Sequence, residues 1–313
     1  MERKANRIII RLMSLIVFCI CVFVSSFITL TGCSRTAAIT PIKIATKPMT
    51  EQYILGEMLK QLIESETGYD VEVTKGIAGG TSNIQPAMIN GDFDLYPEYT
   101  SSGYVLVLDK TAKDVSDDEI WDTLNKEYPE KFDMKWISRY GFNNTYCVVV
   151  NGDVARRNNL KTTSDLATIA EELIFGANPD YFERADGFPA LKEAYGLNFK
   201  DIVQIDIGLR YVALDSGEID VTNGQTTEAQ LAVSDVVVLD DNLNLHANYF
   251  CSTVVRNDAL KTYPKLEAAL NKMDGILSDS EMTKLNYEVS VVKRDEAEVA
   301  HEYLVSKGIL KVG

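Results

Sequence analysis

The side chains of this sequence that could perform chemistry are mainly tyrosines. The chain holds fifteen Tyr and only two Trp. Tyr99, Tyr146 and Tyr249 each lie next to or within an apolar, strand-like run, so three strands could bring them to one cavity. Aromatic faces around a cavity attract a cation, by about 0.5–2 kcal/mol for each well-placed ring, and suit quaternary ammonium groups best. Each tyrosine could instead fill an ordinary core.

Catalytic and metal-binding patterns are scarce. The only histidines are His246, in an expected loop, and His301, on an expected C-terminal helix, and we expect both at the surface. They leave little from which to build a Ser-His or Cys-His pair. The Gly-rich turn over 76–82 lacks the Lys of a phosphate-binding P-loop. The sequence therefore predicts a protein that is not an enzyme, with no cofactor and no metal site.

The N-terminus predicts export. Four basic residues precede an uncharged run over 12–32, which ends in Leu30-Thr31-Gly32-Cys33. Small residues directly before a Cys resemble bacterial lipoprotein signals. This resemblance implies a signal peptide over 1–32, a lipid on Cys33 and a polar tether over 33–40, with the chain on the extracytoplasmic face of the cell membrane. An uncleaved membrane anchor is the alternative, with the same topology.

Charge restricts the partners. The formal net charge is -15 and falls to -18 when residues 1–32, with four basic groups and one acidic group, are removed. Such a surface repels nucleic acid phosphates, so no nucleic acid partner is expected.

Two cysteines remain beyond Cys33, and their state is open. Cys147 and Cys251 occupy similar apolar runs, 145–150 and 249–255. If these runs pair side by side, the thiols could form a disulfide, which the extracytoplasmic compartment permits. Two buried free thiols are the other interpretation, because a bridge needs Cα atoms within about 7 Å.

Strand-like and helical patterns alternate along the mature chain, which predicts an α/β fold. Two sequence segments are similar, NGDFDLYPEYT over 90–100 and SGEIDVTNGQT over 216–226. Each places a polar loop at the carboxyl end of a short strand, where open α/β sheets bind ligands. The repeat suggests a clamp of two lobes, although two unrelated turns would also explain it.

The two similar apolar runs suggest how the lobes are joined. If the first run leaves lobe 1 and the second returns to it, two crossings form a hinge. This interpretation assigns 41–145 plus 252–313 to lobe 1 and 146–251 to lobe 2.

Several motifs, in order along the mature chain, resemble those of the glycine betaine/carnitine/choline-binding lipoproteins of osmoprotectant ABC importers. They are Thr50–Leu59 (TEQYILGEML), Asp94–Thr100 (DLYPEYT), Phe142–Tyr146 (FNNTY), Phe182–Arg184 with Asp186-Gly187, Gly208–Tyr211 (GLRY) and Asp220–Asn223 (DVTN). The resemblance implies a two-lobed periplasmic-binding-protein fold of type II, with two hinge crossings and a ligand cleft between the lobes. It also implies a small quaternary amine as ligand, and ABC permease and ATPase subunits as partners.

Carried over position by position, the resemblance implies a ligand site. Tyr99, Tyr146 and Tyr249 would form the aromatic cage, and Gln225 stands where a fourth aromatic residue is expected. The remaining implied contacts are Lys47 and Arg184 to the ligand's carboxylate, Ser102 beside them, and Asn144 near the cationic head.

Gln225 departs from the family pattern and leaves the ligand open. An amide can hydrogen-bond an N–H cation or a hydroxyl, so carnitine or a less methylated amine could replace choline. Another small polar cation, such as a polyamine, or an amino acid is the alternative ligand class. A secreted hydrolase and a sensory ligand domain are alternatives of another kind, disfavoured by the scarce histidines and by the lack of a second apolar span.

Overall fold

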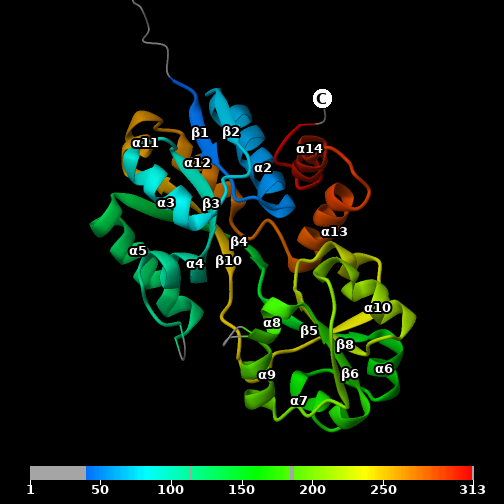
Figure 1. The fold of residues 1–313 in the computed structure, drawn as a ribbon. Coiled ribbons are helices and arrows are strands. Elements are labelled where there is room, and N and C mark those ends of the chain that lie inside the picture. The colour runs from blue at the N-terminus through cyan, green and yellow to red at the C-terminus, as the bar shows by residue number, and fades with distance from the viewer. Residues whose placement is uncertain (1–39, 113–114, 184–186, 312–313) are drawn as a thin grey trace, which may run out of the picture. The chain divides into compact units, whose positions relative to one another are not determined.

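The computed structural model describes residues 40–112, 115–183 and 187–311, and the strands in these ranges form two five-stranded sheets (Figure 1). The first sheet, ordered β2-β1-β3-β10-β4, contains β1 (Ile42–Ala45), β2 (Val71–Thr74), β3 (Leu95–Tyr99), β4 (Met134–Asn143) and β10 (Phe250–Arg256). The second sheet, ordered β7-β6-β8-β5-β9, contains β5 (Tyr146–Asn151), β6 (Ile174–Ala177), β7 (Asp201–Gln204), β8 (Val221–Gln225) and β9 (Val236–Leu239). The expected signal peptide over 1–32, Cys33 and Arg184 lie outside the described residues.

The first sheet combines parallel strands with a returning antiparallel one. β1 is parallel to β2 and β3, whereas β10 is antiparallel to β3 and β4 and places Cys251 opposite Tyr99. The carboxyl ends of β1 and β3 therefore lie at one edge of the sheet, where open α/β sheets bind ligands.

Helices cover both faces of the first sheet (Figure 1). The helix α2 (Thr50–Thr67) buries the expected apolar stripe completely, and Gly68 ends it with a φ of 73°. The same core includes side chains of α11 (Asn257–Thr262), α12 (Leu266–Leu270), α13 (Asp279–Ser290) and α14 (Glu296–Ser306). A second core, which contains both tryptophans, lies beneath α3 (Thr81–Asn90), α5 (Asp117–Phe132) and the π-helical turn η1 (Gly103–Val107).

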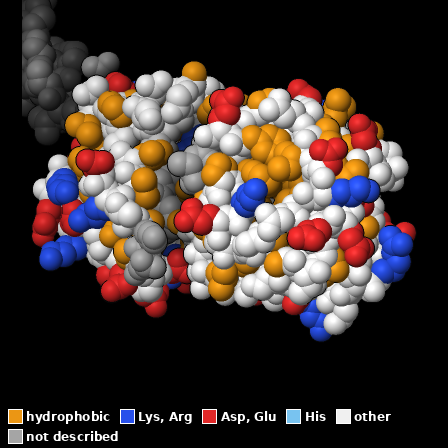
Figure 2. Space-filling view, turned by 60° about the horizontal axis from the view of Figure 1, so that its bottom comes forward, with side chains coloured by type: hydrophobic (Ala, Val, Ile, Leu, Met, Phe, Trp, Pro, Cys, Tyr) orange, Lys and Arg blue, Asp and Glu red, His pale blue; other side chains and the backbone are white. Residues whose placement is uncertain are grey.

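The second sheet has its own cores. Val148 and Phe175 belong to a cluster that also draws on the surrounding helices, and the rings of four other aromatic residues lie within 6.3 Å of Phe175. The helices and turns of this part are α6 (Gly152–Arg157), α7 (Thr163–Leu166), η2 (Ala170–Glu172), α8 (Pro179–Glu183), α9 (Phe188–Tyr195), η3 (Ile207–Leu209), α10 (Arg210–Ser216) and η4 (Ala229–Ala232). Acidic side chains are spread over the face of the protein in Figure 2, in keeping with the acidic composition.

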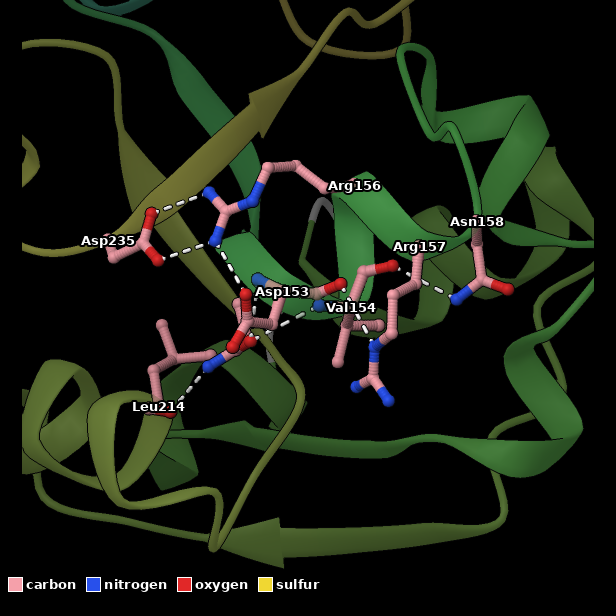
Figure 3. Close-up of polar contacts among 8 residues, drawn as sticks. Asp153, Val154, Arg156, Arg157, Asn158, Leu214 and Asp235 are labelled. Atoms are coloured by element: carbon pink, nitrogen blue, oxygen red, sulfur yellow. Dashed lines mark hydrogen bonds and ion pairs between the residues drawn. The ribbon is translucent and has the colours of Figure 1, made fainter.

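An exposed polar cluster holds α6 against the second sheet (Figure 3). The side chain of Asn151 caps the helix, accepting hydrogen bonds from the N–H groups of Asp153 and Val154 at 3.0 and 3.3 Å. The guanidinium of Arg156 binds both carboxylate oxygens of Asp235 at 2.7 Å. These side chains are largely exposed, so the cluster explains a helix position and suggests no ligand.

Three features differ from the sequence-based expectations. No strand was expected over the whole of Met134–Asn143, yet β4 is the longest strand among the described residues. The apolar runs containing β5 and β10 do not pair with each other, because β5 lies between β8 and β9 and β10 between β3 and β4. Phe250 and Cys251, which the expected boundary assigns to lobe 2, pair within the first sheet.

Because β5 and β10 lie in different sheets, Cys147 and Cys251 do not form a disulfide in the structure. Cys147 and Cys251 are both free and buried, and they belong to the cores of different sheets. Burial raises the pKa of both thiols. The structure therefore contradicts the disulfide interpretation and agrees with the interpretation of two buried free thiols.

Candidate functional site

A buried ion pair lies at the carboxyl ends of β1 and β3. Lys47, two residues beyond β1, pairs with Glu98 near the end of β3, and the two side chains are 10% and 0% exposed. The hydroxyl of Thr81 donates to Glu98 at 2.7 Å, and the backbone N–H of Tyr99 donates to the same carboxylate at 2.6 Å. Lys47 is therefore already neutralised inside the protein.

Tyr99 lies between two charged groups. The ammonium of Lys47 is 4.7 Å from the centroid of its ring, a cation–π distance. Its hydroxyl donates to the carboxylate of Glu51, in the first turn of α2. Burial, followed by the charge of Glu51, holds the pKa of Tyr99 well above its usual range, so the phenol stays protonated. A ligand cation would have to use the ring face that Lys47 does not cover.

The crossing from β4 to β5 holds Asn144 and Tyr249 together. The N–H of Asn144 donates to the carbonyl of Tyr249 at 3.2 Å, and its side-chain amide donates to Glu51 at 3.0 Å. The N–H of Tyr249 donates to the side chain of Asn143 at 2.7 Å. A continuous set of contacts thus connects Lys47 and Tyr99 to Asn144 and Tyr249.

Tyr146 and Gln225 are neighbours in the second sheet. They are opposite each other in the antiparallel pair of β5 and β8. The ring of Tyr181 lies 6.0 Å from that of Tyr146, and the ring of His246 lies 5.5 Å from it. The expectation that His246 is a surface residue is wrong, since it is half-buried against Tyr146, whereas His301 is exposed as expected.

Ser102 lies in the short helix α4 (Thr100–Ser102), directly after β3, and is half-buried. The neighbouring Ser101 is fully buried and donates to the carbonyl of Asn248 at 2.5 Å. The structure therefore places Ser102 near the same end of β3 as Tyr99. It brings Lys47, Tyr99, Asn144 and Tyr249 into one network, with Tyr146 and Gln225 paired in the other sheet.

A second buried network supports the carboxyl end of β8. Arg210 is 3% exposed and donates to Glu228 at 2.8 Å and to the carbonyl of Asn223. The hydroxyl of Tyr211 donates to the other oxygen of Glu228 at 2.6 Å. Burial and the Glu228 charge raise the pKa of Tyr211. These contacts hold the loop after β8 and leave the Arg210 charge compensated.

Sequence reasoning missed several residues of these networks. Glu51 and Glu98 lie within the motifs that carry the resemblance, so a signal for them was present. Asn286, which donates to Glu51 at 3.1 Å from α13, lies in no such motif. His246 and Tyr181 approach Tyr146 only through the fold of the second sheet.

The described residues suggest neither a metal site nor a membrane span. Among them, no group of three or more His, Cys, Asp or Glu side chains is arranged to hold a metal ion. In the same ranges, no helix is long and apolar enough to cross a membrane.

Comparison with known proteins agrees with this architecture. The model of a protein family described as the substrate binding domain of ABC-type glycine betaine transport systems matches residues 40–306. A crystal structure of a glycine betaine/carnitine/choline ABC transporter superposes with a TM-score of 0.81 at 31% identity, covering 86% of this chain and 99% of that one. The expected α/β fold of a periplasmic binding protein is thereby confirmed.

Two curated relatives are similar over most of this chain. An ergothioneine transport permease/ergothioneine binding protein of Helicobacter pylori is 39% identical over 269 residues, which are 86% of this chain. The match spans only about half of that relative, 48% of its length. A carnitine transport binding protein of Listeria monocytogenes is 35% identical over 266 residues, covering 84% of this chain and 85% of the relative.

Proposed function

Because this chain belongs to the family of substrate-binding domains of ABC-type glycine betaine transport systems, we propose that it captures a small quaternary-ammonium zwitterion for an ABC importer. The family match over 40–306 is the observation that carries the proposal. Family members are transport proteins and not enzymes, and they act outside the cytoplasm. The partners would be a permease, which receives the ligand, and an ATPase.

The proposed ligand site uses the residues expected from the sequence. Tyr99, Tyr146 and Tyr249 would surround the methylated nitrogen, with Gln225 at the fourth wall and Asn144 beside it. The contacts that join Asn144 to Tyr249, and the pairing of Tyr146 with Gln225, support this assignment. Closure of two lobes, one built on each sheet, would give affinity only when both touch the ligand.

The proposed carboxylate contacts are Lys47, Arg184 and Ser102. Lys47 has three N–H donors, so it could bind a ligand carboxylate while it keeps Glu98. A zwitterion suits such a site, because one of its ends fits an aromatic cage and the other fits charge-assisted hydrogen bonds.

A ligand screen by thermal unfolding tests the proposal. The panel contains glycine betaine, carnitine, choline, ergothioneine, a polyamine and several amino acids. A true ligand at 100 times its Kd stabilises the folded chain by about 2.7 kcal/mol, and decoys do not. Tyr146→Ala should remove most of this stabilisation, whereas Tyr69→Ala, two residues before the distant edge strand β2, should keep it. A chain that responds to amino acids or polyamines alone belongs to the alternative ligand class.

Ergothioneine is the second candidate ligand. Gln225 and His246 place polar groups around Tyr146. A larger betaine with a hydrogen-bonding ring would use these groups, and the relative from Helicobacter pylori is named for ergothioneine. A Tm shift that is larger for ergothioneine than for glycine betaine at equal concentration would favour it.

We further propose that the protein is lipid-anchored through Cys33 after removal of residues 1–32. Cys33→Ser in the full-length chain should release the protein from the membrane fraction or leave the signal uncleaved. Unchanged processing and membrane attachment in that variant would contradict the anchor.

A further inference from the structure

A buried carboxylate that no sequence argument singled out lies at the centre of the candidate site. Glu51 is 3% exposed and accepts hydrogen bonds from three side chains on three different segments. They are the hydroxyl of Tyr99, the amide of Asn144 at 3.0 Å and the amide of Asn286 at 3.1 Å. Its place in the first turn of α2 adds the favourable end of the helix dipole.

The donors to Glu51 are neutral, which leaves its charge uncompensated. Among the described residues, no Lys or Arg forms an ion pair with Glu51, and the nearby pair of Lys47 and Glu98 cancels itself. Hydrogen bonds from neutral donors satisfy the oxygens of a buried carboxylate without removing its negative charge. The described part of the site therefore carries one net negative charge next to the Tyr99 ring.

The same carboxylate also links the two sheets. The amide of Asn286 that binds Glu51 donates to the carbonyl of Thr227 as well, at 2.9 Å, in the loop after β8. Asn144 connects Glu51 to Tyr249. Glu51 thus contacts Tyr99 directly and reaches Tyr249 and the loop after Gln225 through one amide each.

We propose that Glu51 is a positioning and specificity-determining residue, which orients the Tyr99 ring and makes the ligand site selective for cations. This inference rests on the proposed function. The hydrogen bond to the carboxylate restricts rotation of the phenol and adds electron density to its ring, which strengthens attraction for a cation. The uncompensated charge adds a Coulomb attraction that an uncharged ligand of the same shape does not feel.

Charge selectivity is tested with choline and its neutral carbon isostere, dimethylbutanol, by calorimetric titration. Glu51→Gln should weaken choline binding by about tenfold or more and change binding of the neutral isostere much less. Glu64→Gln, the same charge change farther along α2, is the matched control and should leave both affinities unaltered. Equal losses for the two ligands, or no loss for choline, would overturn the selectivity role.

The positioning role is tested by coupling and by a readout that needs no ligand. The combined loss from Glu51→Gln and Tyr99→Phe should be smaller than the product of the single losses, because Glu51→Gln weakens and Tyr99→Phe removes the same hydrogen bond. In NMR spectra with labelled tyrosine, Glu51→Gln should shift and broaden the Tyr99 ring signals. Asn286→Ala, which keeps the charge, should retain the preference for choline over its isostere.

These measurements separate the two proposals. A wild-type chain that binds no quaternary amine refutes the proposed function and, with it, the selectivity of Glu51. Unchanged Tyr99 signals in a folded Glu51→Gln chain refute the positioning role even if quaternary amines bind. Should Glu51→Gln fail to fold, Asn286→Ala and Tyr99→Phe supply the test. Additive losses of ligand affinity from these two variants would contradict a shared hydrogen-bond network around Glu51.

Discussion

The phenol of Tyr99 is fixed in place by two charged neighbours. Its hydroxyl is bound to Glu51 and one ring face is covered by Lys47. Ordering a side chain in advance lowers the entropy lost on binding, which favours affinity. The arrangement also means that the ring itself offers only its second face to a cation.

The two buried thiols give a residue-level prediction. A chain starting at residue 34 contains Cys147 and Cys251 alone, and the raised pKa of both keeps them as unreactive thiols. We expect almost no labelling by iodoacetamide in the native protein at pH 8. Two labels should appear after denaturation without reductant. Absence of labels until a reductant is added would instead reveal a disulfide, and Cys251→Ser should reduce the count to one.

Among the helices, α13 connects the sheets and depends on its N-terminal cap. Ser278 and Glu281 form a capping box, and Lys307 pairs with Glu281 at 2.8 Å. Burial opposes ionisation of Glu281, but the hydrogen bonds from Lys307 and Ser278 outweigh it and lower the pKa to about 2. Thr283 of the same helix donates to the carbonyl of Thr226, beside the candidate site.

The lowered pKa predicts a pH dependence. Because the folded value lies below the ordinary 4.5, the ionised Glu281 stabilises the fold above about pH 4.5, and this stability is lost as the pH falls toward 2. Its side chain is 33% exposed, so screening reduces the effect to about 1 kcal/mol. Urea denaturation should show Glu281→Gln less stable by this amount at pH 7 and by less at pH 3. A pH-independent difference, or an equal effect of the exposed Glu218→Gln, would contradict it.

Two glycines are expected to tolerate an added methyl group to different degrees. A Cβ on Gly103 would lie 2.3 Å from the buried indole of Trp136, whereas one on Gly152 would meet the exposed ends of Asp235 and Arg156 at 2.4 and 2.7 Å. The indole cannot move in its core, but the exposed side chains can. We expect Gly103→Ala to lower the free energy of unfolding by about 1–3 kcal/mol and Gly152→Ala by clearly less. Denaturant titration of both variants measures the two losses in the free energy of unfolding. Equal losses would contradict this prediction.

The whole molecule has separate cores for its two sheets, which predicts separable unfolding. Phe175 is fully buried in the second sheet, and Phe175→Ala should cost that core about 3–5 kcal/mol. Both tryptophans, Trp121 and Trp136, belong to the first sheet's core, so tryptophan fluorescence reports on that part alone. The far-UV circular dichroism of the variant should begin to change at a lower temperature than its fluorescence.

The control for this prediction lies in the first sheet's core. Leu124→Ala, in the cluster that holds the tryptophans, should instead lower the midpoint temperature of the fluorescence transition. Coincident transitions in the Phe175→Ala chain would mean that the contacts of α13 with the second sheet make the two cores unfold as one.

Local patterns were sufficient for much of the fold. The stripe of α2, its end at Gly68 and the strand runs around Leu95 and Val148 follow from periodicity and from residue conformational preference. The alternation of these segments, together with the ordered motifs, indicated the α/β binding-protein architecture and the family. The candidate site residues were carried over position by position from the family resemblance and remain predictions.

Only the tertiary structure decided which of these residues meet. The run of β5 joins the second sheet and that of β10 the first, which separates Cys147 from Cys251, because strand pairing depends on contacts far apart in sequence. Glu51 acquires its donors from segments 48, 93 and 235 positions away. The charge and hydrogen bonding of a buried site depend on such distant neighbours, and the periodicity of residues along the chain does not predict which residues these are.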